Sequence, residues 1–195
     1  PRCRTGCRGC VADSADAPAL QRADRPFGSG TDGAAAFAQF LDSCDVITFD
    51  KEAVGDDMLT VLLEEGQRKR LAIRPAVGTL HMLKDKALQK TWLQEKGLPT
   101  LPFQIIAGRP DALADLTQVL GPSLVQKRRC GGYDGRGVQV LKSVASLEHL
   151  WDVPSIVEPF LPGCQEISVI TARACTGELQ TYPPVKMEFD PQLNS

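Results

Sequence analysis

The sequence has little of what marks several common functional classes. It contains only two histidines, His81 and His149, in unrelated segments, so neither a Ser/His/Asp triad nor a histidine metal site can be built from them. No apolar run approaches the roughly 20 residues that span a bilayer, and no signal peptide is visible. The formal net charge of -2 argues against nucleic acid or an acidic membrane as the main partner.

The cysteines do not form an obvious disulfide framework. There are seven, an odd number, and without a signal peptide this favours reduced thiols in the cytoplasm. Cys3, Cys7 and Cys10 have the C-x3-C-x2-C spacing that holds an iron–sulfur cluster in radical enzymes that use S-adenosylmethionine. A cluster needs a shielding pocket. Here arginines separate the cysteines and no strand precedes them, so we favour a disordered or altered chain end.

What the sequence does contain is typical of a globular protein with a sizeable core. Hydrophobic residues make up 43% and charged residues 24%. The first half alternates strand-like and helix-like patterns, which indicates a parallel α/β unit. We expect the end of a strand at 11–13, a loop at 15–32, a helix at 34–41, a buried strand at 45–49, and a helix at 58–65 closed by Gly66. A boundary is expected near Arg74-Pro75.

The second half has shorter elements and more turns. The expected elements are a helix at 83–96, a strand at 101–106, a helix at 111–120, a hairpin around residues 124–141, a short helix at 145–151, a strand at 156–158, a longer strand at 166–174, and a strand at 179–182 after a Thr176-Gly177 turn.

The hairpin carries the most informative stretch of the chain, Gly131-Gly132-Tyr133-Asp134-Gly135-Arg136-Gly137, preceded by Lys127-Arg128-Arg129. Glycines let backbone N–H groups turn toward an anion, and the basic side chains can supply charge to phosphate oxygens. No Gly-Lys-Ser/Thr and no helix follow, which excludes the P-loop and the dinucleotide fingerprint. A glycine-rich hairpin over nucleotide phosphates, as in kinases, is the closer analogue. Composition alone also allows an ordinary flexible hairpin.

Other polar residues are weak signals when taken alone. Lys86 and Lys90 are four residues apart on one face of a predicted helix, where a solvated basic stripe is the simplest interpretation. Glu158 ends one predicted strand, and Glu166 opens the next. Neither carboxylate is diagnostic without its context.

The order of these residues and of the segments below resembles that of the N5-carboxyaminoimidazole ribonucleotide synthase family of ATP-grasp enzymes. The resemblance covers roughly residues 13 to 193. The glycine-rich loop is the most specific motif. The other matching segments are Asp45-Val46-Ile47-Thr48-Phe49, Asp85-Lys86-Ala87-Leu88-Gln89-Lys90, Gly97-Leu98-Pro99-Thr100, Pro102-Phe103, Lys127, Val157-Glu158, Glu166-Ile167-Ser168-Val169 and Tyr182-Pro183.

The resemblance implies that ATP lies between two small β-rich lobes. It makes Lys127 the lysine near the α-phosphate and adenine, and Lys86 a basic contact from the preceding helix. It makes Glu166 the acceptor of the ribose hydroxyls. The loop that closes on the phosphates would comprise Gly132, Tyr133, Asp134, Gly135, Arg136 and Gly137. The hinge strand, whose backbone pairs with the adenine edge, would comprise Glu158, Pro159, Phe160 and Leu161.

The resemblance also implies a reaction and its partners. ATP, bicarbonate and 5-aminoimidazole ribonucleotide would give the N5-carbamate, ADP and phosphate, by way of carboxyphosphate. Magnesium would neutralise much of the charge. A cytoplasmic homodimer is expected, with no nucleic acid and no membrane partner. No residue is assigned a catalytic role.

The implied fold class is α/β, with α+β nucleotide lobes. Residues 1–75 would form part of a Rossmann-like pre-ATP-grasp domain. Residues 76–195 would form an incomplete ATP-grasp domain, with its first lobe at 76–155 and the start of its second at 156–195. The family's opening glycine-rich turn is absent before residue 11, and its metal ligands are expected beyond Ser195, so we expect no turnover from this chain alone.

One substitution also departs from the family, because Lys186 stands where Glu is expected. The alternatives are another carboxylating or formylating ATP-grasp ligase, or a non-catalytic nucleotide-binding remnant.

Overall fold

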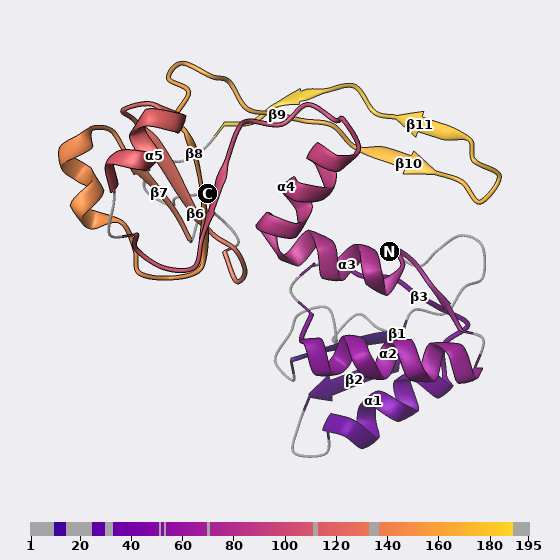
Figure 1. Ribbon diagram of the computed structural model, residues 1–195. Coiled ribbons are helices and arrows are strands. Elements are labelled where there is room, and N and C mark those ends of the chain that lie inside the picture. The colour runs from indigo at the N-terminus through magenta and orange to yellow at the C-terminus, as the bar shows by residue number, and fades with distance from the viewer. Residues whose placement is uncertain are drawn as a thin grey trace. The chain divides into compact units, whose positions relative to one another are not determined.

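The computed structural model in Figure 1 describes residues 10–14, 25–29, 33–50, 52, 54–69, 71–110, 113–132 and 137–188. The chain divides into two compact units, Pro1–His81 and Met82–Ser195. The division falls within helix α3 (Val77–Lys84), a few residues after the expected boundary at Arg74-Pro75. The assignment of these units to the two named domains stays a prediction.

The first unit is a parallel α/β arrangement, as predicted. Its strands pair in parallel, β1 with β2 and β3 with β4. Helices α1 and α2 lie between the strands in sequence. The bounds are β1 Cys10–Ser14, β2 Arg25–Ser29, α1 Gly33–Asp42, β3 Val46–Ile47, α2 Asp56–Lys69 and β4 Ala72–Ile73. The expected strand at 11–13 and the two expected helices are therefore confirmed.

The core of the first unit is built from the apolar faces of its helices. α1 buries Phe40 and Leu41, and α2 buries Leu59 and Leu62, three residues apart on one helical face. Ile47 of β3 joins them, together with Val77 and Leu80 of α3. The strand pattern at 45–49 is only half buried, because Val46 is exposed while Ile47 is not.

Two predictions for the first unit are wrong. Strand β2 lies inside the segment expected to be a loop, where its Pro26 and flanking glycines hid the pattern. Gly66 does not end α2, which continues to Lys69. A Cβ at Gly66 would lie 2.7 Å from Cδ1 of Ile73, so glycine serves the close approach of β4 instead.

The second unit contains a four-stranded antiparallel sheet in the order β5-β8-β6-β7. The hairpin predicted around the glycine-rich stretch is confirmed as β6 and β7. Before the sheet comes α4, and α5 follows β5. The bounds are α4 Lys86–Glu95, β5 Gln104–Ile106, α5 Leu113–Leu120, β6 Leu124–Arg128, β7 Val138–Leu141, the 3-10 helix η2 Val144–His149 and β8 Ser155–Pro159.

The two faces of this sheet have different roles. One face packs its apolar residues into a core with α5 and η2; that core contains Ile106, Leu116, Leu120, Leu124, Leu141, Leu147, Leu150 and Val157. Side chains alternate between the faces of a strand, so Val125, Lys127, Ile156 and Glu158 lie on the other face. Helix α4 packs against β8. The second face therefore carries Lys127 and Glu158.

A buried amide, which the sequence did not reveal as important, ties the sheet to the chain before β8. Gln126 is fully buried, and its Nε2 donates to the Trp151 carbonyl and the Ser155 hydroxyl, both at 3.0 Å. Its Oε1 accepts from the Trp151 amide at 2.9 Å and from Nε2 of Gln139 at 2.5 Å. A buried polar side chain whose donors and acceptors are all hydrogen-bonded holds the local backbone in one conformation. This network sets the position of the neighbouring Lys127.

The predicted helix at 83–96 is two helices, α3 and α4, because Asp85 interrupts it. Asp85 takes an extended conformation, and its carboxylate accepts from the Ala87 and Leu88 amides, so it is the N-cap of α4. The predicted helix at 145–151 is the shorter 3-10 helix η2.

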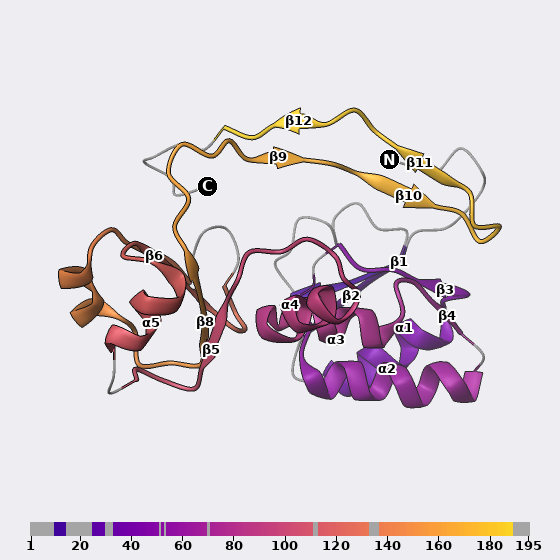
Figure 2. The ribbon, with the colours of Figure 1, turned by 45° about the horizontal axis from the view of Figure 1, so that its top comes forward.

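The predicted strand at 166–174 is also two elements, β9 (Ile167–Ser168) and β10 (Thr171–Arg173), in a long two-stranded ribbon (Figure 2). β9 pairs with β12 (Val185–Lys186), and β10 pairs with β11 (Leu179–Thr181). Between these pairs the partner strand contains Pro183 and Pro184, which have no N–H to donate. The ladder is therefore interrupted there.

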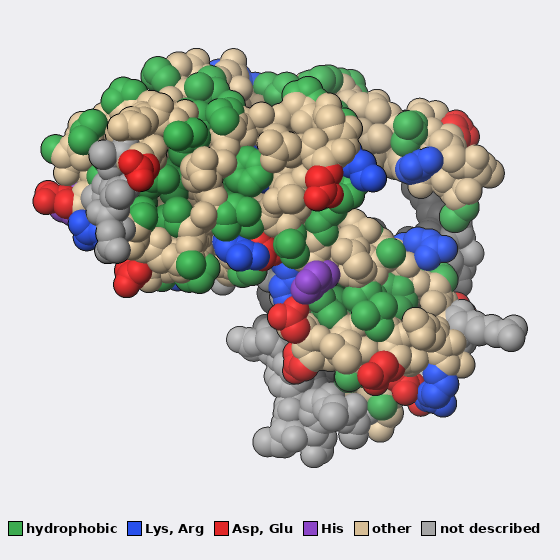
Figure 3. Space-filling model, in the orientation of Figure 1, with side chains coloured by type: hydrophobic (Ala, Val, Ile, Leu, Met, Phe, Trp, Pro, Cys, Tyr) green, Lys and Arg blue, Asp and Glu red, His purple; other side chains and the backbone are tan. Residues whose placement is uncertain are grey.

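The surface agrees with the small net charge. Basic and acidic side chains are intermixed on the face drawn in Figure 3, and neither sign gathers into one large patch. No helix in the described part of the chain has the length and apolar character needed to cross a bilayer.

Candidate functional site

The centre of the candidate site is Glu158, a buried carboxylate on β8. Its Oε2 accepts from Nζ of Lys127 at 2.6 Å, and its Oε1 accepts from Nζ of Lys90 on α4. The Lys90 side chain is 10% exposed and that of Lys127 is 33% exposed. Two ammonium groups thus share one carboxylate, which leaves a surplus positive charge on the more open lysine. Such a surplus favours an anionic ligand.

The lysines keep Glu158 ionised. Burial by itself raises the pKa of this carboxyl, but hydrogen bonds and charge attraction from Lys127 and Lys90 outweigh burial, so the pKa is lowered below its ordinary value. Glu158 is therefore a fixed negative charge at neutral pH.

Apolar side chains surround this charged cluster. Val138 and Val140 of β7 lie directly opposite Lys127 and Val125 on the same face of the sheet, and both are partly exposed. On the other side, the Phe103 ring lies 5.1 Å from Nζ of Lys90. An apolar face beside a surplus cation suits a ligand that has both an aromatic ring and phosphates.

The glycine-rich loop closes tightly at its two ends. Gly137 has φ +93°, and a Cβ there would lie 2.9 Å from Cα of Gly132. Its carbonyl accepts from the Arg128 amide at 2.8 Å. Gly131 has φ +73°, which also favours glycine. Tyr133, Asp134, Gly135 and Arg136 lie outside the described residues, so the contacts predicted for them stay predictions.

We expect Gly137→Ala to distort this loop more than Gly131→Ala does. Both positions have a positive φ, which costs a non-glycine residue on the order of 1–3 kcal/mol. A methyl group at 137 would also meet the backbone of Gly132, whereas at 131 it would meet nothing within 4 Å. Thermal denaturation and ATP titration of both variants should show the larger loss for Gly137→Ala. Equal losses would mean that the close approach has no energetic weight.

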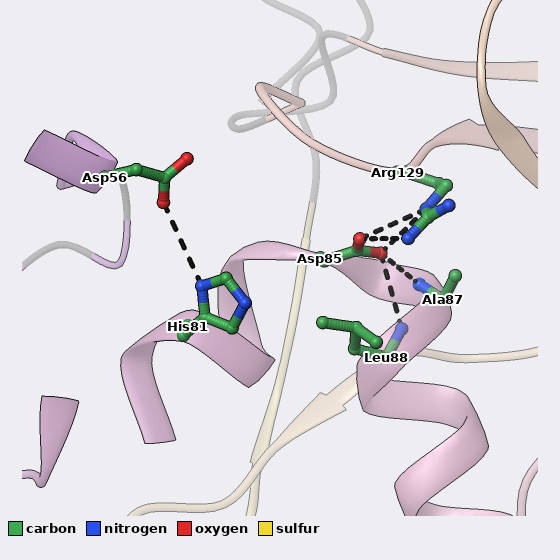
Figure 4. A network of polar contacts seen from close by, with 6 residues as sticks. All are labelled: Asp56, His81, Asp85, Ala87, Leu88 and Arg129. Atoms are coloured by element: carbon green, nitrogen blue, oxygen red, sulfur yellow. Dashed lines mark hydrogen bonds and ion pairs between the residues drawn. The ribbon is translucent and has the colours of Figure 1, made fainter. Parts of the chain in front are cut away.

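The start of the loop is attached to the N-terminus of α4. Nζ of Lys86 donates to the Gly132 carbonyl at 3.1 Å, and the Lys86 amide donates to the Arg129 carbonyl at 2.9 Å. Asp85 caps the helix and also accepts from Nε of Arg129 at 3.1 Å (Figure 4). The other pair in Figure 4, His81 with Asp56 at 3.9 Å, lies within the first unit. The helix therefore sets the position of the loop.

Asp85 also has a lowered pKa. Burial raises it, but the Arg129 guanidinium and the amides of Ala87 and Leu88 outweigh burial. Asp85 is thus ionised while it connects the helix N-terminus to the loop.

We expect Asp85→Ala to destabilise the second unit by about 1–2 kcal/mol, the usual cost of losing an N-cap. Asp85→Asn keeps an oxygen that can accept from the Ala87 amide but loses the charge toward Arg129, so it should cost less. Urea denaturation of the two variants provides the comparison. Equal losses would contradict a separate contribution from capping.

The backbone after β8 has an open edge. The Phe160 amide donates to the Ser123 carbonyl at 2.8 Å, on the side of β6. Because backbone groups alternate along a strand, the Pro159 carbonyl and the Leu161 amide point to the opposite edge. There β5 pairs with β8 only as far as Val157. The Pro159 carbonyl, an acceptor, and the Leu161 amide, a donor, can thus pair with the edge of a planar ligand.

The structure brings together most of the described site residues that the sequence predicted. Lys86 contacts Gly132, Gly132 approaches Gly137, and Lys127 contacts Glu158. Glu166 is exposed in the ribbon, where its carbonyl accepts from the Met187 amide at 3.0 Å. No contact of its side chain with the other site residues is found among the described residues. Its predicted role toward ribose stays a prediction.

Sequence reasoning gave no site role to Lys90 or Asp85. It expected Arg129 to supply charge to phosphates, whereas the Arg129 guanidinium pairs with Asp85. The interpretation of Lys90 as part of a solvated stripe is wrong, because α4 buries Lys90 and Ala87 while it exposes Leu88 and Trp92. The apolar pair Leu88 and Trp92, four residues apart, suggested the opposite buried face, so the sequence offered no direct signal for Lys90.

No metal site is found in the described part of the chain, where no three His, Cys, Asp or Glu side chains are grouped so that they could hold an ion.

Comparison with known proteins shows which family and which relatives this chain is similar to. The ATP-grasp domain family matches residues 91–191, which contain Lys127, the loop and Glu158. The N5-carboxyaminoimidazole ribonucleotide synthase of Synechococcus elongatus is 39% identical over 180 residues, covering 90% of this chain and 44% of that protein.

Solved structures of similarly named proteins match the fold of this chain. Carboxyaminoimidazole ribonucleotide synthase from Aspergillus clavatus, complexed with ATP, matches with a TM-score of 0.77 at 26% identity, covering 94% of this chain and 48% of that one. The Thermotoga maritima synthetase matches with a TM-score of 0.73 at 30% identity, covering 91% and 46%. The chain thus spans less than half the length of these relatives.

Proposed function

This chain belongs to the ATP-grasp domain family, and from that premise we propose that the protein binds ATP and uses it to carboxylate 5-aminoimidazole ribonucleotide. The observation that carries the ATP site is the surplus cation formed by Lys127, Lys90 and Glu158 next to a glycine-rich loop. The observation that selects the substrate is the 39% identity to a synthase of that name.

In this proposal, the nucleotide lies on the face of the sheet that carries Lys127. The adenine edge pairs with the Pro159 carbonyl and the Leu161 amide, and its ring packs on the apolar face next to Val138 and Val140. Lys127 binds the α-phosphate side, and the loop from Gly132 to Gly137 covers the remaining phosphates. Lys86 can exchange its contact with the Gly132 carbonyl for a phosphate oxygen, since a charged acceptor makes the stronger hydrogen bond.

The proposed chemistry consists of two transfers. An oxygen of bicarbonate attacks the γ-phosphorus of ATP, the bond to the β-phosphate oxygen breaks, and ADP leaves. The substrate amine then attacks the carbon of the resulting carboxyphosphate, inorganic phosphate leaves with the electron pair, and the amine loses a proton. Protein groups act here by positioning the reactants and neutralising charge. The basic residues around Lys127 supply part of that neutralisation.

A coupled assay of ADP release tests the proposal. A protein of the relatives' full length that contains this chain should release ADP only when ATP, bicarbonate and 5-aminoimidazole ribonucleotide are all present, whereas residues 1–195 alone should bind ATP without turnover. Replacement of bicarbonate by formate, with the same aminoimidazole substrate, should abolish the signal. Turnover with formate would instead support a formylating ATP-grasp ligase, and ATP binding without any turnover would support a non-catalytic nucleotide-binding protein.

The same proposal includes a cytoplasmic homodimer, and the two domains as predicted, at 1–75 and 76–195. Sedimentation velocity of the purified protein measures the oligomeric state directly. Limited proteolysis with a cut near residues 75–81 would support the domain division.

A further inference from the structure

Lys90 does not fit the usual environment of a lysine. It is buried on a helix whose other buried residue is Ala87, and its ammonium lies over the Phe103 ring and against Glu158. Burying an ammonium is costly unless it is paired and hydrogen-bonded. Lys90 is the more buried of the two partners of Glu158, and Lys127 is the more exposed one. The roles assigned above to the nucleotide site do not use Lys90.

The carboxylate between the two lysines determines what Lys127 can do. Suppose that Glu158 had Lys127 as its sole partner. Any anion that drew Lys127 away would leave a buried carboxylate unpaired, and that penalty would oppose binding. With Lys90 on the other oxygen, Glu158 keeps a partner when Lys127 turns toward a phosphate. The second lysine therefore lowers the cost of moving the first.

We propose that Lys90 is a positioning residue that neutralises Glu158 and so makes the Lys127 ammonium available to the nucleotide phosphates. Lys90 acts through Glu158 and does not touch the nucleotide. The inference rests on the proposed ATP site but not on the identity of the substrate that is carboxylated. It predicts that Lys90 affects phosphate-bearing ligands and leaves the affinity for adenosine unchanged.

The test is isothermal titration of the purified protein with ATP and with adenosine. Lys90→Met should weaken ATP binding about tenfold, within the range usual for coupling between charged neighbours, and leave adenosine binding within about twofold. Lys90→Arg keeps the charge and should restore most of the ATP affinity. Lys142→Met removes an exposed lysine outside the cluster and is the control for total charge; its ATP affinity should be unchanged.

A double variant separates positioning from structural support. In Lys90→Met with Glu158→Gln, no carboxylate restrains Lys127, so ATP affinity should return to within about threefold of the unmodified protein. Loss of a lysine that supported the fold by packing on the Phe103 ring would not be repaired by removing the carboxylate. The double variant also carries no unpaired buried carboxylate. It therefore remains measurable if Lys90→Met alone does not fold.

The possible outcomes are distinct. ATP binding that is equal in the unmodified protein and in folded Lys90→Met overturns the role of Lys90 and leaves the proposed function intact. A double variant that remains tenfold weaker than the unmodified protein also overturns the role. Absence of ATP binding by the unmodified protein overturns both proposals. ATP binding that depends on Lys90, without aminoimidazole-dependent turnover by the protein of the relatives' full length, supports the Lys90 inference and overturns the proposed reaction.

Discussion

Glu158→Gln is expected to lower the free energy of unfolding of the second unit by about 3–5 kcal/mol, because it leaves the buried Lys90 ammonium and the partly exposed Lys127 ammonium without their shared carboxylate. The Lys90 side chain is 10% exposed, so water cannot replace the lost partner. For a unit of this size the loss corresponds to a fall in melting temperature of roughly 10–20 °C. Differential scanning calorimetry measures it.

Two comparisons make this test specific. Glu95→Gln changes the same kind of residue at the exposed end of α4 and should stay within about 0.5 kcal/mol of the unmodified protein. Lys127→Met leaves a neutral Lys90–Glu158 pair and should destabilise far less than Glu158→Gln. A Glu158→Gln protein that melts together with the Glu95→Gln control would show that the cluster does not stabilise the fold.

The same carboxylate predicts a dependence of stability on pH. The pKa of Glu158 is lowered from an ordinary value of 4.5. Its stabilising contribution is therefore fully present above pH 4.5 and is lost as the pH falls through the lower folded-state pKa. We expect the difference in stability between the unmodified protein and Glu158→Gln to shrink in acid, because both then have an uncharged side chain at position 158. Urea midpoints measured at several pH values between neutrality and about 3 provide the comparison; a difference that does not change over this range would contradict the assignment.

The parts of the fold that sequence predicted well are those set by local patterns. The apolar spacing of Leu59 and Leu62 is enough to identify α2 and its buried face. The glycine-rich hairpin is also local, because two apolar runs flank a glycine-rich segment within one short stretch of the chain. These patterns are complete within short stretches of the chain.

Interactions between distant segments could not be predicted in this way. Lys90 and Glu158 are 68 residues apart, and nothing in the spacing around either one names the other. Arg129 and Asp85 are 44 residues apart, and their pairing could not be predicted from local spacing either. The break between α3 and α4 could have been predicted from the sequence, because an aspartate followed by a helical pattern is an N-cap signal. It was missed because the apolar pattern runs on through Asp85.

The resemblance to ATP-grasp enzymes supplied what periodicity could not. It selected Lys127 and Glu158 from among many charged residues, and the structure places their charged atoms 2.6 Å apart. It described Glu158 by its backbone, however, and the structure shows a side chain that organises two lysines. Physical reading of burial and pairing is what adds Lys90 to the site.

Lys127→Met is expected to weaken ATP binding roughly 10- to 100-fold. A hydrogen bond to a charged group contributes about 1.5–3 kcal/mol, which corresponds to that range of affinity. The fold should survive, because Glu158 keeps Lys90 as its partner after the substitution. The change in affinity can therefore be measured with little change in stability, which is not so for Glu158→Gln.

Isothermal titration with ATP, ADP and adenosine tests where the lysine acts. Loss of affinity for both nucleotides, with adenosine unchanged, places the Lys127 ammonium on the phosphates, as the surplus charge of the cluster predicts. The loss should become smaller at higher salt, since Lys127 is partly exposed and its attraction for the ligand is screened. Lys142→Met has the same change in net charge at an exposed site and should bind all three ligands normally. Unchanged ATP affinity in a folded Lys127→Met protein would mean that the surplus charge beside the glycine-rich loop does not serve a nucleotide, and the proposed ATP site would be wrong.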